Sequence, residues 1–255
     1  MMERETRTIL IVEGSATMLN YYGILLKRLE YRVLTATRPE DALKIVEHTM
    51  PSLILTAISF PSMDGVDFIK TLKRNRRTEA IPVAVMTADE QPSVRSACVE
   101  LGCIDYLHKP TTPATLYRVI QAALESTPRD NIRINTSLKA IIGREDAKDG
   151  RAHIAYLSVI SEQGAFVRTL APKAKDSVFP ITFYVDDRVI RAKAVVLYSS
   201  GIEDGTFRET GMGIKFTDIS EDSRSYVRDF ITSQLVSDII MDPSEKTSGV
   251  DIDMT

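Results

Sequence analysis

The stretch Thr8-Ile-Leu-Ile-Val-Glu-Gly-Ser15 decides the fold of the first half of the chain. Its apolar residues are continuous rather than alternating, which is typical of a strand covered on both faces of a parallel sheet. Similar runs, separated by helical patterns, recur at Arg32–Thr37, Ser52–Ile58, Ile81–Ala88 and Asp105–Lys109. This alternation predicts a doubly wound α/β domain with five parallel strands over residues 1–125.

The pattern changes at the polar segment Glu125–Asp130, which predicts a domain boundary, with residues 126–130 forming a linker and the start of an arginine motif. Beyond it, apolar residues alternate with a period of two, and a helix capped by Ser220 follows. The alternating stretches are Ser137–Ile142, Ala152–Ile160, Ala165–Thr169, Val178–Val185, Val189–Tyr198 and Gly211–Phe216. They predict a small antiparallel six-stranded β-barrel with a C-terminal helix over residues 127–241, and a polar, disordered tail over 242–255.

Composition and charge exclude several function classes. A net charge of −3 over 255 residues provides no positive electrostatic potential that would attract nucleic acid, so direct nucleic-acid binding is not expected. No apolar run is long enough to cross a bilayer and the N-terminus is charged, so we expect a cytoplasmic protein without a membrane span. Cys98 and Cys103 lack a histidine cluster or CxxC spacing, and therefore predict reduced, buried thiols and no metal site.

An enzyme is not expected either. His48, His108 and His153 lie far apart in the sequence and have no evident Ser, Cys or Asp partners. The chain contains no Walker or GxGxxG loop, and therefore no motif for holding a nucleotide cofactor. We expect a protein without catalytic residues and without a cofactor.

In an open α/β sheet, the ligand-binding and catalytic residues lie at the carboxyl ends of the strands. Here these ends carry Glu13-Gly14, Ala57, Thr87-Ala88 and Lys109-Pro110. Further motifs are the PSMDG loop at Pro61–Gly65, VMTAD at Val85–Asp89 and YLHKP at Tyr106–Pro110. Together with ILIVEGS, they make the first half resemble the receiver domain of response regulators, the flavodoxin-like phosphoryl acceptor of two-component phosphorelays.

Aspartyl phosphorylation requires a carboxylate nucleophile, acidic side chains that hold Mg²⁺, and a Lys and a Ser or Thr that neutralise the phosphoryl group. The resemblance assigns the last two roles to Lys109 and Thr87. It places Ala57 at the nucleophile position, and leaves only Glu13 of the acidic pair because Gly14 stands at the second position. We therefore expect a vestigial site in a scaffold that forms a homodimer or docks a signalling protein.

Tyr106 lies where the receiver family keeps an aromatic switch residue. The alternative is that this tyrosine simply packs at a strand edge, and the sequence leaves both interpretations open.

Two arginines, Arg129 and Arg133, lie four residues apart where the second half begins. Guanidinium groups bind phosphates through two hydrogen bonds and match the O6/N7 edge of guanine, although an isolated RxxxR pattern is more typical of a charged linker. Farther on, Ser161 and Gly164 lie in a turn between two strands. The serine can hydrogen-bond there, and the glycine permits a positive φ or the close approach of a ligand.

That order of motifs, followed by the strand Gly211–Phe216 and a helix, resembles the PilZ domain over about residues 127–238. PilZ domains are receptors for the bacterial second messenger cyclic di-GMP. The resemblance implies that Arg129 and Arg133 clamp its phosphates and guanine edges, and that Ser161 and Gly164 shape the floor of the site.

One position departs from the PilZ pattern. Val159 stands where the family has Asp or Asn, and valine cannot accept a hydrogen bond from guanine, a loss of about 1–3 kcal/mol. The sequence predicts an effector that binds cyclic di-GMP. The alternative is a protein-interaction adaptor in which the phosphorylation site and the nucleotide site are both degenerate.

Overall fold

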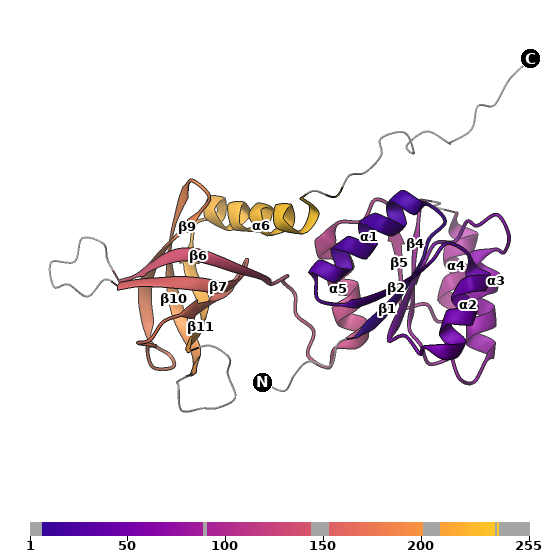
Figure 1. Cartoon of the computed structure of the whole chain (residues 1–255), viewed down its shortest axis with the longest axis horizontal. Coiled ribbons are helices and arrows are strands. Elements are labelled where there is room, and N and C mark those ends of the chain that lie inside the picture. The colour runs from indigo at the N-terminus through magenta and orange to yellow at the C-terminus, as the bar shows by residue number, and fades with distance from the viewer. Residues whose placement is uncertain (1–6, 89–90, 144–152, 201–209, 238, 240–255) are drawn as a thin grey trace, which may run out of the picture. The chain divides into compact units, whose positions relative to one another are not determined.

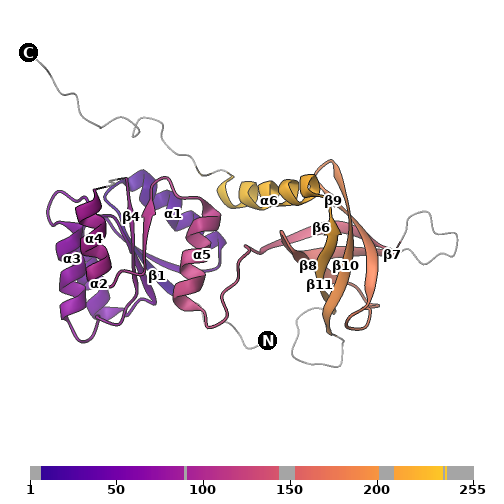
Figure 2. The same ribbon diagram turned by 180° about the vertical axis from the view of Figure 1, so that it is seen from behind.

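The computed structural model describes residues 7–88, 91–143, 153–200, 210–237 and 239. They form two compact units, and the chain passes from the first to the second between Pro128 and Arg129 (Figures 1 and 2). The first unit has a parallel sheet and helices, and the second has a barrel and one helix. Within the described ranges, no helix combines the length and the apolar character that a membrane crossing requires. The predicted tail over 242–255 lies outside the described residues.

The first unit is a five-stranded parallel sheet with the strand order β2-β1-β3-β4-β5. Its elements are β1 (Thr8–Val12), α1 (Ala16–Arg28), β2 (Arg32–Ala36), α2 (Pro39–His48), β3 (Leu53–Thr56), α3 (Gly65–Arg74), β4 (Val83–Thr87), α4 (Pro92–Glu100), β5 (Asp105–His108) and α5 (Pro113–Leu124). Helices α1 and α5 cover one face of the sheet, and α2, α3 and α4 cover the other (Figure 1). The predicted doubly wound fold is confirmed.

The predicted strand bounds differ from the observed ones mainly at the carboxyl ends. The apolar run Ser52–Ile58, for example, outlasts β3, which ends at Thr56. Ala57 and Ile58 are nevertheless 5% and 4% exposed. Because burial continues into the loop, apolar character alone cannot mark the last residue of the strand.

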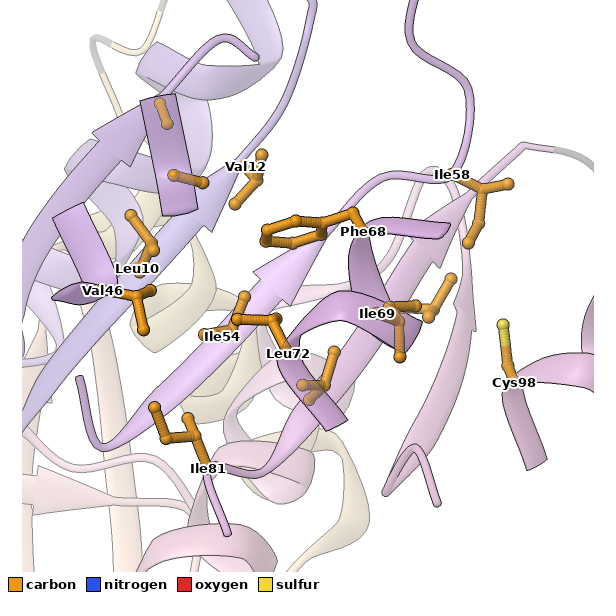
Figure 3. Packing of buried hydrophobic residues seen from close by; sticks show 14 residues of the cluster. Leu10, Val12, Val46, Ile54, Ile58, Phe68, Ile69, Leu72, Ile81 and Cys98 are labelled. Atoms are coloured by element: carbon orange, nitrogen blue, oxygen red, sulfur yellow. The ribbon is translucent and has the colours of Figure 1, made fainter. Parts of the chain in front are cut away.

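The core beneath α2, α3 and α4 explains why these helices form where they do. Phe68, Ile69 and Leu72 lie on one face of α3 and pack toward Leu10 and Ile54 of the sheet (Figure 3). The spacing of these three residues is the amphipathic pattern of a helix that covers a sheet. The helix starts at a defined position because the Asp64 carboxylate accepts a hydrogen bond from the Val66 N–H, at 2.7 Å.

The two cysteines are free thiols. Cys98 is buried in this core and Cys103 is half-buried beside it. Burial raises the pKa of Cys103 to about 12, so its thiol stays protonated at neutral pH.

The second unit is a closed six-stranded barrel with the strand order β10-β11-β8-β7-β6-β9 and antiparallel neighbours. Its strands are β6 (Ile134–Ile142), β7 (His153–Ser161), β8 (Gly164–Arg168), β9 (Val178–Val185), β10 (Arg188–Ser200) and β11 (Gly211–Ile219). Helix α6 (Glu221–Val236) follows, and its buried residues are Val227, Ile231 and Leu235. The Ser220 hydroxyl accepts a hydrogen bond from the Ser223 N–H at 3.2 Å, as expected of the cap. The predicted barrel and C-terminal helix are confirmed.

Strand β6 begins at Ile134, three residues before the predicted start at Ser137. Its pairing with β7 shifts register between Asn135 and Leu138, which marks a β-bulge or irregularity. A bulge adds a residue and breaks the alternation of inward and outward side chains. The first part of the strand was therefore not recognisable by its period.

Candidate functional site

The arginine motif leads directly into the first strand of the barrel. Arg133 immediately precedes β6, and Arg129 is where the chain enters the barrel unit. Ile132 and Ile134 are buried, whereas Arg133 and Asn135 are exposed. This alternation places the side chains of Arg133 and Asn135 on the outer side of the barrel.

The Ser161–Gly164 turn joins β7 to β8 and is closed by its own side chain. The Ser161 hydroxyl donates a hydrogen bond to the Gly164 carbonyl oxygen at 3.0 Å. Ser161 is only 8% exposed. Gly164 does not adopt a positive φ. A Cβ atom built on it would lie 2.2 Å from the Ile214 carbonyl oxygen of β11. Gly164 therefore permits the close approach of β8 to β11. Of its two predicted roles, the positive φ is wrong, and the close approach of a ligand stays a prediction.

Register brings the motif and the turn together. Ile134 pairs with Ile160, and both are buried inside the barrel. In an antiparallel pair, the residue before one member of a facing pair lies opposite the residue after the other member. Arg133, which precedes Ile134, therefore lies opposite Ser161, which follows Ile160. The arginine motif and the serine turn, nearly thirty residues apart in the sequence, thus meet at one end of the barrel.

A row of outward-facing residues crosses five strands beside this end. In register order it consists of Asn135, Val159, Phe166, Gly213 and Tyr198. Of these, sequence reasoning singled out Val159 and the strand that contains Gly213. It missed Asn135, Phe166 and Tyr198, although the alternation from Ile132 to Asn135 was a signal for the first. The two aromatic residues carried no local signal, since only strand pairing brings them together.

The glycines of Gly211-Met-Gly213 accommodate the two aromatic rings. A Cβ atom on Gly213 would lie 2.4 Å from the Tyr198 ring. One on Gly211 would lie 2.2 Å from the Val167 carbonyl oxygen and 2.8 Å from the Phe166 ring. The ring centroids are 6.4 Å apart. The rings therefore lie over the glycine strand, and a side chain at Gly213 would displace the Tyr198 ring, whereas one at Gly211 would displace the β8 backbone as well as the Phe166 ring.

The turn is also linked to α6. Both carboxylate oxygens of Glu162 accept hydrogen bonds from the Arg228 guanidinium, at 2.8 and 3.0 Å. This contact holds the pKa of Glu162 below its usual value. The pair joins the β7–β8 turn, beside the predicted ligand position, to the C-terminal helix.

In the first unit, the structure brings the four predicted receiver residues to the carboxyl end of the sheet. The Ala57 N–H donates to the Val12 carbonyl oxygen at 2.9 Å, and the Lys109 N–H donates to the Thr87 carbonyl oxygen at 2.8 Å. Glu13 directly follows β1, so it joins the same end. All except Lys109 are at most 5% exposed.

Glu13 and Lys109 form an ion pair with each other. Their side chains are 6% and 15% exposed, so both charges are largely withdrawn from water. The other carboxylate oxygen of Glu13 accepts a hydrogen bond from the Ser15 N–H at 3.1 Å. The lysine that would neutralise a phosphoryl group is thus already paired with a carboxylate.

Two tyrosines border this end of the sheet. Tyr22 is fully buried, and its pKa is raised to about 12, chiefly by burial and then by the charge of Glu13. Tyr106 is half-buried, with the Arg95 guanidinium 5.8 Å from its ring centroid. Within the part of the chain that the structure describes, no group of three His, Cys, Asp or Glu side chains could hold a metal ion.

Comparison with protein families gives one match for each unit. Residues 9–121 match the response regulator receiver domain, and residues 127–233 match the PilZ domain. Two-component response regulator ORR7 of Oryza sativa subsp. japonica is 31% identical over 118 residues, 46% of this chain and 56% of that protein. Phosphate regulon transcriptional regulatory protein PhoB of Pseudomonas aeruginosa is 30% identical over 121 residues, 48% of this chain and 53% of that protein. The chain thus spans about half the length of these relatives.

Solved structures give matches of similar extent. The chemotaxis response regulator CheY4 of Vibrio cholerae is 23% identical, with a TM-score of 0.45, and the match covers 47% of this chain and all of that one. A response regulator receiver domain protein from Methanospirillum hungatei JF-1 is 22% identical, with a TM-score of 0.46, over 48% of this chain and 95% of that one.

Proposed function

Because the chain joins a response regulator receiver domain to a PilZ domain, we propose that it is a non-enzymatic bacterial signalling effector that binds cyclic di-GMP through the barrel. The receiver unit then serves as a scaffold that is not phosphorylated and that forms a homodimer or docks a signalling protein. PilZ domains typically bind this messenger, so membership of the family supports the identity of the ligand. The arrangement of the site residues supports the position at which it binds.

One observation carries the proposal: the register of β6 and β7, which places Arg133 at the level of Ser161. A dinucleotide with two phosphates and two guanines needs guanidinium donors near a surface that can receive a base. Arg129 and Arg133 provide the donors, and the outer face at Val159 and Phe166 provides the surface. Both arginines lie in residues 125–133, between α5 and β6. A ligand held by both would order that connecting segment, a recognised way of switching a protein.

The arginines should account for most of the affinity. We expect Arg129→Ala/Arg133→Ala to weaken cyclic di-GMP binding by about a hundredfold or more, because two charge-assisted contacts to phosphate or guanine are lost. Isothermal titration of the full chain measures this, with GTP as the ligand control. Arg191→Ala removes an exposed arginine of β10 and serves as the variant control. Equal affinities in the wild type and the double variant would show that the assigned site is wrong.

The receiver unit should not accept a phosphoryl group. The methyl group of Ala57 cannot attack phosphorus, and Gly14 has no carboxylate with which to coordinate Mg²⁺. Lys109, in addition, is paired with Glu13. We expect no saturable, Mg²⁺-dependent response to beryllofluoride in a thermal-shift titration. The double variant Gly14→Asp/Ala57→Asp should gain one, because a Cβ on Gly14 would lie 3.8 Å from Phe60, an ordinary contact. A saturable response of the wild type would contradict the proposal for this unit.

A protein-interaction adaptor is the second candidate function. Val159 favours it, since this side chain accepts no hydrogen bond, and so does the Ser161 hydroxyl, which already bonds to Gly164. The titration separates the two candidates, because an adaptor releases no heat with cyclic di-GMP at high concentration.

A further inference from the structure

Asn135 is the direct cross-strand neighbour of Val159. The two residues face each other in the antiparallel pair of β6 and β7. Cβ atoms of directly opposed residues lie about 4.5–5.5 Å apart, so either side chain reaches a ligand atom placed between them. A polar group missing at position 159 can therefore be supplied from position 135.

Asn135 also points to the correct side of the barrel. The neighbouring pair of Ile134 and Ile160 is buried inside, which places Asn135 and Val159 on the outer face. Asn135 is exposed, and Arg133, two residues before it, is exposed too. A ligand phosphate at Arg133 would thus have its base within reach of Asn135.

Local irregularities separate this end from the rest of the barrel. Pairing of β6 with β7 shifts between Asn135 and Leu138, and pairing of β7 with β8 shifts between Leu157 and Val159. Bulges occur often beside binding sites, where they redirect side chains. Here the two shifts occur just where Asn135 and Val159 meet.

We infer that Asn135 recognises guanine in this site, with its amide oxygen accepting a hydrogen bond from the 2-amino group of the base. The inference rests on the proposed binding of cyclic di-GMP. An asparagine amide has one acceptor oxygen and two donor hydrogens, so it can replace the acceptor that Val159 does not offer. Val159 and Phe166, adjacent in the same row, then form an apolar floor beneath the base.

The test compares cyclic di-GMP with cyclic di-IMP, whose hypoxanthine bases lack the 2-amino group. Full-length wild type should bind cyclic di-GMP roughly tenfold to a hundredfold more tightly than cyclic di-IMP in isothermal titration. Asn135→Ala should bind both ligands with about the affinity that the wild type has for cyclic di-IMP. The double variant Asn135→Ala/Val159→Asn should again bind cyclic di-GMP more tightly than cyclic di-IMP. Ser137→Ala, an exposed change farther along β6, should keep it.

The alternative outcomes are distinct. If Asn135→Ala keeps the preference, or weakens both ligands equally, the role assigned to Asn135 is wrong while binding of cyclic di-GMP stands. If the wild type binds neither ligand, the proposed function fails, and the inference fails with it.

Discussion

Lys109→Met should destabilise the receiver unit by about 3 kcal/mol, because it leaves the Glu13 carboxylate buried without a counter-charge. The Glu13 side chain is 6% exposed. Without Lys109, its carboxylate keeps the hydrogen bond from the Ser15 N–H but loses its ion pair. Methionine fills much of the space of the lysine stem, so the loss comes from charge rather than from a cavity. Native-state hydrogen exchange of peptides from β1 and β3 measures the free energy of opening of this unit.

Two comparisons isolate the charge effect of Lys109→Met. The double variant Glu13→Gln/Lys109→Met should recover most of the stability, because no uncompensated charge remains. Lys70→Met breaks an exposed pair with Asp67, with side chains 43% and 63% exposed, and should cost less than about 1 kcal/mol. A deficit as small as that of Lys70→Met would contradict a structural role for the Glu13–Lys109 pair.

Gly65→Ala should destabilise the same unit by about 3 kcal/mol, because backbone surrounds the position. A Cβ atom there would lie 2.6 Å from the Ile58 Cα, 2.7 Å from the Ile58 carbonyl oxygen and 2.8 Å from the Ala57 carbonyl oxygen. None of these atoms can move without displacing the loop after β3, or α3, which starts at Gly65. Hydrogen exchange should therefore rise most in peptides covering residues 57–74.

Gly23→Ala provides the matched control for Gly65→Ala. Gly23 lies in α1 of the same unit, and no atom lies within 4 Å of a Cβ atom built on it. Alanine costs less backbone entropy than glycine in a helix, so this variant should gain about 0.5–1 kcal/mol. If both variants lost stability to a similar degree, the close approach at Gly65 would not be the cause.

The sequence predicted the architecture because its two signals are local. Continuous apolar runs such as Ile9–Val12 indicate a buried parallel strand, and alternation such as that in Val178–Val185 indicates a barrel strand. The start of β6 was missed because the shift after Asn135 breaks the alternation. A bulge depends on the partner strand, and this information is not contained in a short window of sequence.

The candidate sites were predictable as residue types but not as contacts. Resemblance to known families identified Lys109 and Glu13, yet their mutual ion pair joins residues 96 positions apart. The sequence predicts that Gly164 permits the approach of a ligand, but it does not show that this glycine also permits β8 to approach Ile214 on β11. Phe166 and Tyr198 lie in the same row as Val159 only because β8, β11 and β10 pair in a particular register. Long-range pairing decides each of these contacts.

Closure of the barrel also decides how partners can attach to this protein. Among the described strands, β9 bonds to both β6 and β10, so the barrel has no edge to which a partner could add a strand. The receiver sheet is open and ends in β2 and β5, of five and four residues. Of the strands that the structure describes, those open to strand addition and edge-to-edge aggregation thus belong to the receiver sheet, where short edges limit both. A protein partner of the barrel has to recognise its side chains.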